Sequence, residues 1–154
     1  MTPSLGRRKR GFIARKRPKT RLGAKKRKKT KLPSITKLIK QADAILSIQV
    51  RGLDKDPEGF ANCYTCPAYQ PRKMLQCGHW ISRRHKAVRW HRDNVRIQCG
   101  GCNKFRNGEP IKFRKNLVAE IGAQRVSVLE DIYDQKILLT REFLLSKIEE
   151  LKKT

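Results

Sequence analysis

All five cysteines and all three histidines of this 154-residue chain lie between residues 60 and 102. Four of the cysteines form two Cys-x-x-Cys pairs, Cys63 with Cys66 and Cys99 with Cys102. A two-residue spacing lets both thiolates of a pair reach one ion from a tight turn, and two pairs supply the four ligands of a tetrahedral zinc site. We therefore predict that these four cysteines bind a structural Zn²⁺.

The segment between the two pairs is longer than in an ordinary zinc ribbon. Cys66 and Cys99 are separated by 32 residues, whereas ribbons commonly place about 15 to 20 residues between their pairs. The insertion contains the basic stretch CGHWISRRH, residues 77–85. One interpretation is a purely structural or DNA-binding ribbon in which Cys77 or a histidine replaces one thiolate. If the paired cysteines bind the zinc, Cys77 is left as a small buried residue or as a neighbour of a second metal.

The order of the motifs around this insertion resembles a nuclease family. Cys-x-x-Cys, Gly-His, Asn-Val and Cys-x-x-Cys-Asn follow one another along the chain, as in the zinc-containing branch of the HNH (His-Me finger) nucleases. Within that branch, the run CGHWISRRHKAVRWHRDNVRIQCGGCNKFRNG resembles the phage lambda NinG (Rap) recombination endonucleases, most strongly over about residues 60–125. The resemblance implies a ββα finger with one divalent ion, which hydrolyses DNA to a 5′-phosphate and a 3′-hydroxyl.

The resemblance also implies roles for three residues. His79 matches the general base that activates water, Asn94 matches the asparagine that braces the loop orienting this histidine, and Asn103 matches the final metal-binding position. A histidine of ordinary pKa, near 6.5, is largely neutral at intracellular pH and can accept a proton. Mg²⁺ or Mn²⁺ takes oxygen ligands, so the Asn103 amide and the scissile phosphate can hold it together. Without its neighbours, His79 would fit a structural histidine or a zinc ligand better.

The chain departs from the HNH pattern at the residue before the histidine, which is often an acidic metal ligand and here is Gly78. Either Asn103 holds the catalytic ion almost alone, or another group contributes. Two of the candidate groups are histidines, for which contact with phosphate or exposure to solvent is the simpler interpretation. The candidates are Cys77, His85, His91 and Asp93.

Basic residues in and after the insertion fit contacts with a nucleic-acid backbone, because the planar fork of arginine matches phosphate oxygens. Trp90 either stacks on an unpaired base, as in proteins that grip single strands, or fills a small core between Val88 and Val95. The predicted nucleic-acid contacts are Arg83, Arg84, Lys86, Arg89, Trp90, Arg92, Arg96, Lys104 and Arg106.

The formal net charge of +25 is concentrated in two segments. Residues 1–33 contain fifteen lysines or arginines and no acid, and residues 72–115 carry 13 basic and two acidic residues, a net +11. We expect a disordered basic arm and a basic folded centre that both contact one polyanion, DNA in this case. A nuclear-localisation signal, or a basic protein of the ribosomal kind, would have a similar composition.

No stretch of the sequence approaches the roughly 20 apolar residues of a membrane helix. The N-terminus is charged but lacks the apolar run of an export signal. We therefore expect a soluble cytoplasmic protein whose thiols stay reduced and available to metal. The resemblance adds a phage or prophage origin, with the protein acting inside the bacterial host.

Hydrophobic periodicity indicates the elements that position these residues. Short apolar alternations near residues 73–80 and 95–98 predict the two strands of a hairpin. Apolar residues at helical spacing predict helices over residues 35–51, 111–121 and 126–133, and a last helix from Thr140 onward. With the resemblance, the expected fold class is α+β: a small zinc-stabilised ββα-metal (HNH) finger flanked by α-helices, with a disordered basic N-terminal tail.

The corresponding domains are a disordered basic arm (1–33), a helix and linker (34–59), a zinc-bound HNH-like finger (60–122) and C-terminal helices (123–154). The C-terminal helices are nearly neutral in sum. We expect them to pack within the chain or to pair with a second copy in a homodimer.

The expected function is a metal-dependent DNA endonuclease. The resemblance extends this to branched recombination intermediates such as D-loops and Holliday junctions. One alternative is a zinc-ribbon protein that binds nucleic acid and cuts nothing. Another is an HNH nuclease that reads a sequence in duplex DNA.

Overall fold

The computed structural model describes residues 32–53 and 57–153. Residues 1–31, which form almost all of the predicted basic arm, lie outside this description. From Leu32 onward the chain forms one compact unit. No helix among the described residues combines the length and the apolar character needed to cross a bilayer.

Two short antiparallel hairpins form the β-structure. Strand β1 (Phe60–Asn62) pairs with β2 (Tyr69–Pro71), and strand β3 (Gln76–His79) pairs with β4 (Val95–Gln98). The β3–β4 hairpin confirms the prediction from apolar alternation. Its register places His79, the last residue of β3, opposite Val95, the first residue of β4.

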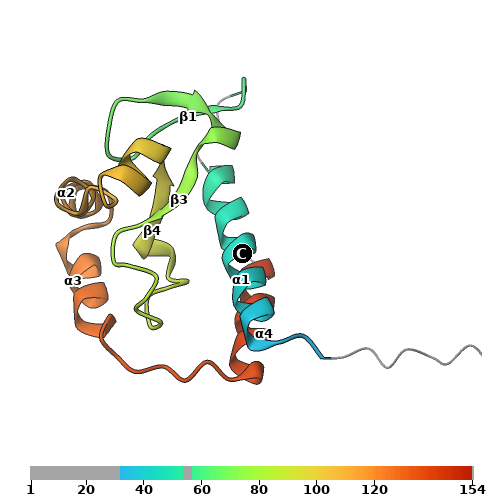
Figure 1. Cartoon of the computed structure of the whole chain (residues 1–154). Coiled ribbons are helices and arrows are strands. Elements are labelled where there is room, and N and C mark those ends of the chain that lie inside the picture. The colour runs from blue at the N-terminus through green and yellow to red at the C-terminus, as the bar shows by residue number, and fades with distance from the viewer. Residues whose placement is uncertain (1–31, 54–56, 154) are drawn as a thin grey trace, which may run out of the picture. The chain divides into compact units, whose positions relative to one another are not determined.

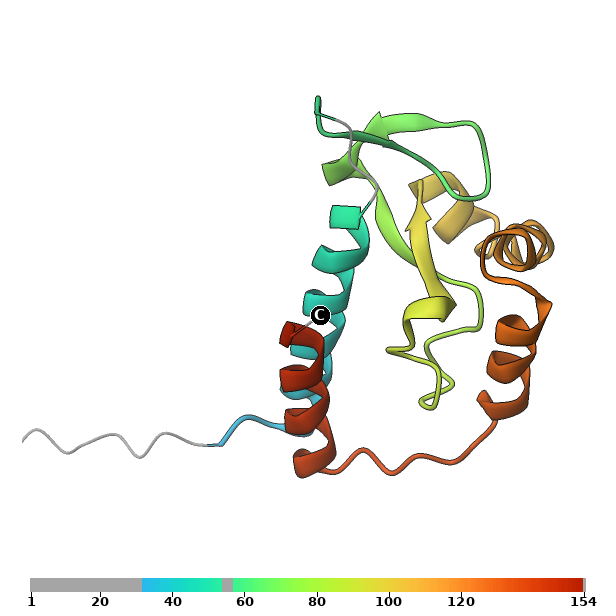
Figure 2. The same ribbon diagram turned by 180° about the vertical axis from the view of Figure 1, so that it is seen from behind.

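Helices α1 (Ile35–Leu53) and α4 (Arg141–Lys153) lie on one side of the β3–β4 hairpin, as both views show (Figures 1 and 2). On α1, apolar residues recur at every fourth position and form a stripe that faces the core. The stripe meets a corresponding stripe on α4. The buried residues of the two stripes are Leu38, Ala42, Leu46 and Val50 on α1, and Leu144, Ile148 and Leu151 on α4.

Helices α2 (Pro110–Ile121) and α3 (Ala123–Ile132) lie on the other side of the hairpin (Figure 1). They pack against each other through a second small core of Phe113, Leu117 and Val126. Gly122 separates the two helices with a φ of 85°, a conformation that suits glycine. The predicted helices are thus confirmed, and their bounds agree with the prediction to within three residues.

A linker over residues 133–140 runs from α3 to α4 with little regular structure (Figures 1 and 2). It brings α4 back to α1, so the apolar stripe of α4 is covered within the chain. The homodimer expected through these helices stays a prediction. Short helical turns complete the fold: the 3-10 turns η1 (Arg72–Met74) and η2 (Arg92–Asn94), and the π-helical turn η3 (Gly101–Phe105).

Candidate functional site

The four paired cysteines lie together. Cys63 and Cys66 come from the turn that joins β1 to β2, and Cys99 and Cys102 follow β4. All four Sγ atoms lie within 4.8 Å of one another, and those of Cys66 and Cys99 are 3.7 Å apart. Four sulfurs bound to one zinc at about 2.3 Å are separated by roughly 3.8 Å. The donor set and its spacing can therefore hold a structural metal such as zinc.

Hydrogen-bond donors surround the cysteine cluster, as expected for thiolates. The backbone N–H of Cys99 donates to Cys63 Sγ over 3.2 Å, and that of Cys102 donates to Cys99 Sγ over 3.4 Å. Arg106 Nη2 donates to Cys102 Sγ over 2.8 Å. This guanidinium offsets part of the negative charge that four thiolates carry.

Cys77 lies outside this cluster and lines a neighbouring cleft. Burial raises the pKa of its thiol to about 12, and the nearby Asp43 carboxylate acts in the same direction. The thiol is therefore protonated at neutral pH. Both expectations for Cys77, a small residue of the interior or a neighbour of a second metal, stay predictions.

The cleft has a volume of about 830 Å³ and lies between α1, strand β3 and the turn η3. His79 and Asn103, two of the three residues that the resemblance selects, both line it. Four cationic side chains line it as well: Lys40, Arg51, Arg83 and Lys104. The cleft thus brings the predicted base and the predicted metal ligand to one basic surface.

The imidazole of His79 is held in one tautomer. Its Nε2 lies 3.1 Å from the backbone carbonyl oxygen of Arg89. A carbonyl can only accept, so Nε2 carries the proton and Nδ1 keeps its lone pair. Burial lowers the pKa of His79 below its ordinary value, and the charges of Arg83 and Arg89 lower it further, whereas the bond to the Arg89 carbonyl and the charge of Asp43 oppose them. The ring is therefore neutral at neutral pH, with Nδ1 available as a base.

The side chain of Asn94 is fully buried and holds the loop between β3 and β4. Its Oδ1 accepts from the backbone N–H of Ile81 over 2.8 Å. Its Nδ2 donates to the carbonyl oxygens of Ile81 and Val88 over 2.9 and 3.0 Å. These three bonds brace both ends of the loop that carries Arg89, whose carbonyl orients His79.

Asn103 lies on the π-helical turn η3 and faces Gln76 of β3. Its Nδ2 donates to Gln76 Oε1 over 2.8 Å. This bond turns the amide so that Oδ1 has no hydrogen-bond partner among the described residues. Asn103 lines the cleft, and its predicted role as an ion ligand stays a prediction.

Gly78 has no room for a side chain. A Cβ atom at this position would lie 2.1 Å from Gln98 Oε1, far inside van der Waals contact. Gln98 is itself fully buried, and its Nε2 donates to Thr65 Oγ1 and to the Gly108 carbonyl, both over 2.8 Å. The space of an acidic ligand at position 78 is therefore filled by the amide of Gln98.

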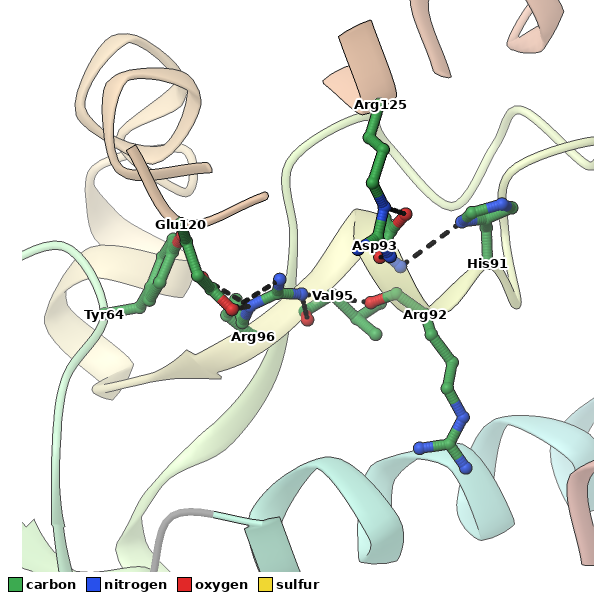
Figure 3. Close-up of polar contacts among 8 residues, drawn as sticks. All are labelled: Tyr64, His91, Arg92, Asp93, Val95, Arg96, Glu120 and Arg125. Atoms are coloured by element: carbon green, nitrogen blue, oxygen red, sulfur yellow. Dashed lines mark hydrogen bonds and ion pairs between the residues drawn. The ribbon is translucent and has the colours of Figure 1, made fainter. Parts of the chain in front are cut away.

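The histidine and aspartate candidates for the missing ligand do not line the cleft. The ring of His85 packs edge-on against Tyr133 with centroids 5.0 Å apart. His91 Nδ1 accepts from the backbone N–H of Asp93, whose carboxylate pairs with Arg125 of α3 over 2.6 Å. Figure 3 shows the contacts of His91, Asp93 and Arg125. All three residues make packing or scaffold contacts, and none of them lines the cleft that contains His79.

A polar network connects β4 to helix α2 (Figure 3). Arg96 forms a bidentate contact with Glu120 of α2, over 2.8 to 3.1 Å, and Tyr64 donates to the same carboxylate over 2.7 Å. Arg96 Nη1 also donates to the Arg92 carbonyl over 3.0 Å. The network ties α2 to the strand that begins directly after Asn94.

The predicted nucleic-acid contacts fall into two groups. Arg83 and Lys104 line the cleft, and Arg84 and Lys86 are exposed without a side-chain partner among the described residues. The other basic side chains are engaged within the chain: Arg89 with Asp43, Arg92 with Gln49, Arg96 with Glu120, and Arg106 with Glu109.

Trp90 is 6% exposed and belongs to the main core. Its ring lies 6.4 Å from that of Phe143, and its indole N–H donates to Asp43 Oδ1 over 2.9 Å. Trp90 is therefore a core residue, which corrects the prediction that it contacts nucleic acid by stacking on a base.

Sequence reasoning treated α1 as scaffold and missed its part in the cleft. Lys40, Asp43, Ser47 and Arg51 line it, and their spacing places them on one face of the helix. A polar face at this spacing is visible in the sequence, but most such faces are simply solvated. Only the docking of α1 against β3 shows that this one borders His79.

Comparisons with curated proteins and with solved structures gave no match. A family model did match, and it covers nearly the whole chain, from residue 5 to residue 154. Its family is described as the bacteriophage lambda NinG protein. On this match the chain belongs to the NinG family.

Proposed function

We propose that this protein is a metal-dependent DNA endonuclease of the HNH type. One observation carries the proposal: a neutral histidine with a free Nδ1 and an asparagine with a free Oδ1 line the same basic cleft. A base and an oxygen ligand on either side of one phosphate are what metal-assisted hydrolysis needs. The hairpin followed by a helical turn is the arrangement expected of a ββα-metal finger.

The residues of the cleft would act in sequence on a bound strand. Lys40, Arg51, Arg83 and Lys104 attract the phosphodiester backbone into the cleft. His79 Nδ1 then takes a proton from a water molecule, which attacks phosphorus and displaces the 3′ oxygen. Asn103 Oδ1 would hold Mg²⁺ or Mn²⁺ together with the scissile phosphate, and the ion would supply positive charge for the developing negative charge.

A branched substrate, such as a D-loop or a Holliday junction, is part of the proposal. It is supported by membership of the lambda NinG family together with the resemblance to recombination endonucleases. A nuclease that reads duplex sequence would use the same cleft, so cleavage of matched linear and four-way DNAs distinguishes the two. A zinc-ribbon binder would have no need for the orienting bonds around His79.

The test incubates the full chain with labelled linear, flap, D-loop and four-way DNA, with and without added Mg²⁺ or Mn²⁺. We expect cleavage of the branched substrates only when the ion is added. His79→Ala should lower the single-turnover rate by at least about 10²-fold, as expected for the loss of a general base. Zinc content and DNA affinity should be retained, because His79 is not among the clustered cysteines.

Two further variants sharpen the test. Asn103→Ala should lower the rate in a way that higher Mg²⁺ partly restores, because it removes an ion ligand. His85→Ala is the matched control and should cut normally, because His85 lies outside the cleft. Equal activity of the wild-type and His79→Ala proteins would leave only a DNA-binding function.

A further inference from the structure

We propose that Asp43 is a positioning residue for His79, which acts from α1 through the peptide unit between Arg89 and Trp90. The inference deepens the proposed function and rests on it. Asp43 lies 36 residues before His79 in the chain and outside the predicted finger. If Asp43 positions His79, helix α1 contributes a functional residue to the site.

A single carboxylate anchors two consecutive side chains. Asp43 Oδ1 accepts from Arg89 Nε and from Trp90 Nε1, each over 2.9 Å, and Oδ2 accepts from Arg89 Nη2 over 2.6 Å. The peptide group between these two residues contains the Arg89 carbonyl. That carbonyl accepts from His79 Nε2 over 3.1 Å. Fixing the side chains on both sides of this peptide group fixes the direction of its carbonyl.

The orientation of this carbonyl sets the chemistry of His79. While the carbonyl accepts from Nε2, the Nδ1 lone pair is the free one. If the peptide group turned, nothing else among the described residues would hold the proton on Nε2. The ring could then present either nitrogen to the cleft, and a base misplaced by about 1 Å can cost about 10²-fold in rate.

The contacts of Arg89 extend the same anchor into the loop. Arg89 Nη1 donates to the Arg83 carbonyl over 2.9 Å, so one guanidinium joins α1 to two points of the loop. The ion pair also makes Asp43 compatible with DNA. Asp43 lines the cleft, where an unpaired carboxylate would repel phosphate, and Arg89 neutralises it.

Three donors already occupy the Asp43 carboxylate, which favours positioning over metal binding. Asparagine at this position would retain one acceptor oxygen and turn an NH₂ group toward Arg89 or Trp90. At least one donor would then face another donor. Asp43→Asn therefore breaks the anchor while keeping nearly the same volume.

The experiment compares Asp43→Asn with Glu130→Gln in the full chain. Glu130 is the matched control, because it also receives a bidentate arginine, Arg114, over 2.8 and 3.2 Å, but lies away from the cleft. We expect Asp43→Asn to lower the single-turnover rate at saturating DNA by up to about 100-fold, the loss that a misplacement of about 1 Å can cause. DNA affinity should be unchanged or tighter, and Glu130→Gln should match the wild type.

The second readout does not depend on cleavage. The ¹⁵N chemical shifts of the His79 ring report which nitrogen carries the proton. We expect the Nε2–H form in the wild type and in Glu130→Gln, and a mixture of tautomers in Asp43→Asn. If Asp43→Asn loses zinc or unfolds, Arg89→Lys, which keeps the charge but not the bidentate contact, is measured in its place with the same two readouts.

Three results would contradict the positioning role of Asp43 or the proposed function. A wild-type rate and an unchanged tautomer in the variant would overturn the positioning role. Recovery of the variant by high Mg²⁺ would also overturn it, because Asp43 would then act as an ion ligand. If the wild type cuts no substrate, the proposed function fails, while the tautomer of His79 still shows whether Asp43 orients the ring.

Discussion

The absent side chain at position 78 removes one candidate ligand from the ion site that we propose in the cleft. In the HNH pattern this position often carries an acidic ligand, and Gly78 offers none. The reason is steric, because the buried amide of Gln98 occupies the space that a Cβ would need. Asn103, whose Oδ1 is unpartnered among the described residues, is the ion ligand that we propose for the cleft.

An acidic residue at position 78 should therefore destabilise the fold. We expect Gly78→Asp, and already Gly78→Ala, to lower the free energy of unfolding by about 1 to 3 kcal/mol, the usual cost of forcing extra atoms into a packed site. Thermal unfolding with zinc bound measures the effect. Gly52→Ala is the matched control, because a Cβ there meets nothing closer than 4.0 Å and α1 tolerates alanine well. A Gly78→Ala protein as stable as the wild type would contradict the steric account.

The family resemblance selected His79 and Asn103, and the fold brings both to one cleft. It did not select Asp43, whose role depends on a tertiary contact. Asn94 holds the loop through bonds to Ile81 and Val88, which are close to it in sequence. Asp43 contacts Arg89 across 46 positions. No local pattern specifies such a contact, because it depends on how α1 docks against the hairpin.

Helix α1 supplies one wall of the cleft, and a cation lies at each end of the stretch that lines it. Lys40 and Arg51 lie about 16 Å apart along the helix, since each residue adds about 1.5 Å. Between them Asp43 is paired with Arg89, so the wall is effectively cationic. A strand in the cleft would meet two positive charges on α1 besides those of Arg83 and Lys104.

We therefore expect the double variant Lys40→Gln/Arg51→Gln to bind DNA more weakly. The slope of log affinity against log salt concentration should fall in magnitude by about 2, at about 0.9 per lost phosphate contact. A fluorescence titration over a range of salt concentrations measures it. Lys136→Gln/Lys153→Gln is the matched control, because it removes the same charge outside the cleft. An equal change of slope in both variants would mean that α1 contributes only general charge.

The elements differed in how well the sequence predicted them. The long helices were predicted because an apolar stripe repeats over several turns, as in α1 and α4. The β1–β2 hairpin was missed, because three-residue strands are too short to show an alternation. The π-helical turn was missed as well, since it is imposed by the bonds that surround Cys99 and Cys102.

For the whole molecule, the cysteine cluster adds a second connection between two hairpins that share the main core with α1 and α4. It connects the β1–β2 turn to the end of β4, and three of its cysteines belong to the main core. The hairpins are short, and isolated hairpins of this size are marginal in water. The sequence leads to the expectation that a metal supports this region, because residues 60–102 contain too little apolar mass to form a core of their own.

Loss of the metal should therefore unfold the finger. Structural zinc sites contribute about 10 to 16 kcal/mol in apparent terms, which is comparable to the total stability of a typical domain, about 5 to 15 kcal/mol. We expect Cys63→Ser, or removal of zinc from the wild type, to abolish the cooperative thermal transition. Cys77→Ser is the matched control, because Cys77 lies outside the cluster, and it should keep one zinc per chain and nearly the wild-type midpoint. An unchanged midpoint in Cys63→Ser, or loss of zinc in Cys77→Ser, would show that a different set of ligands holds the fold together.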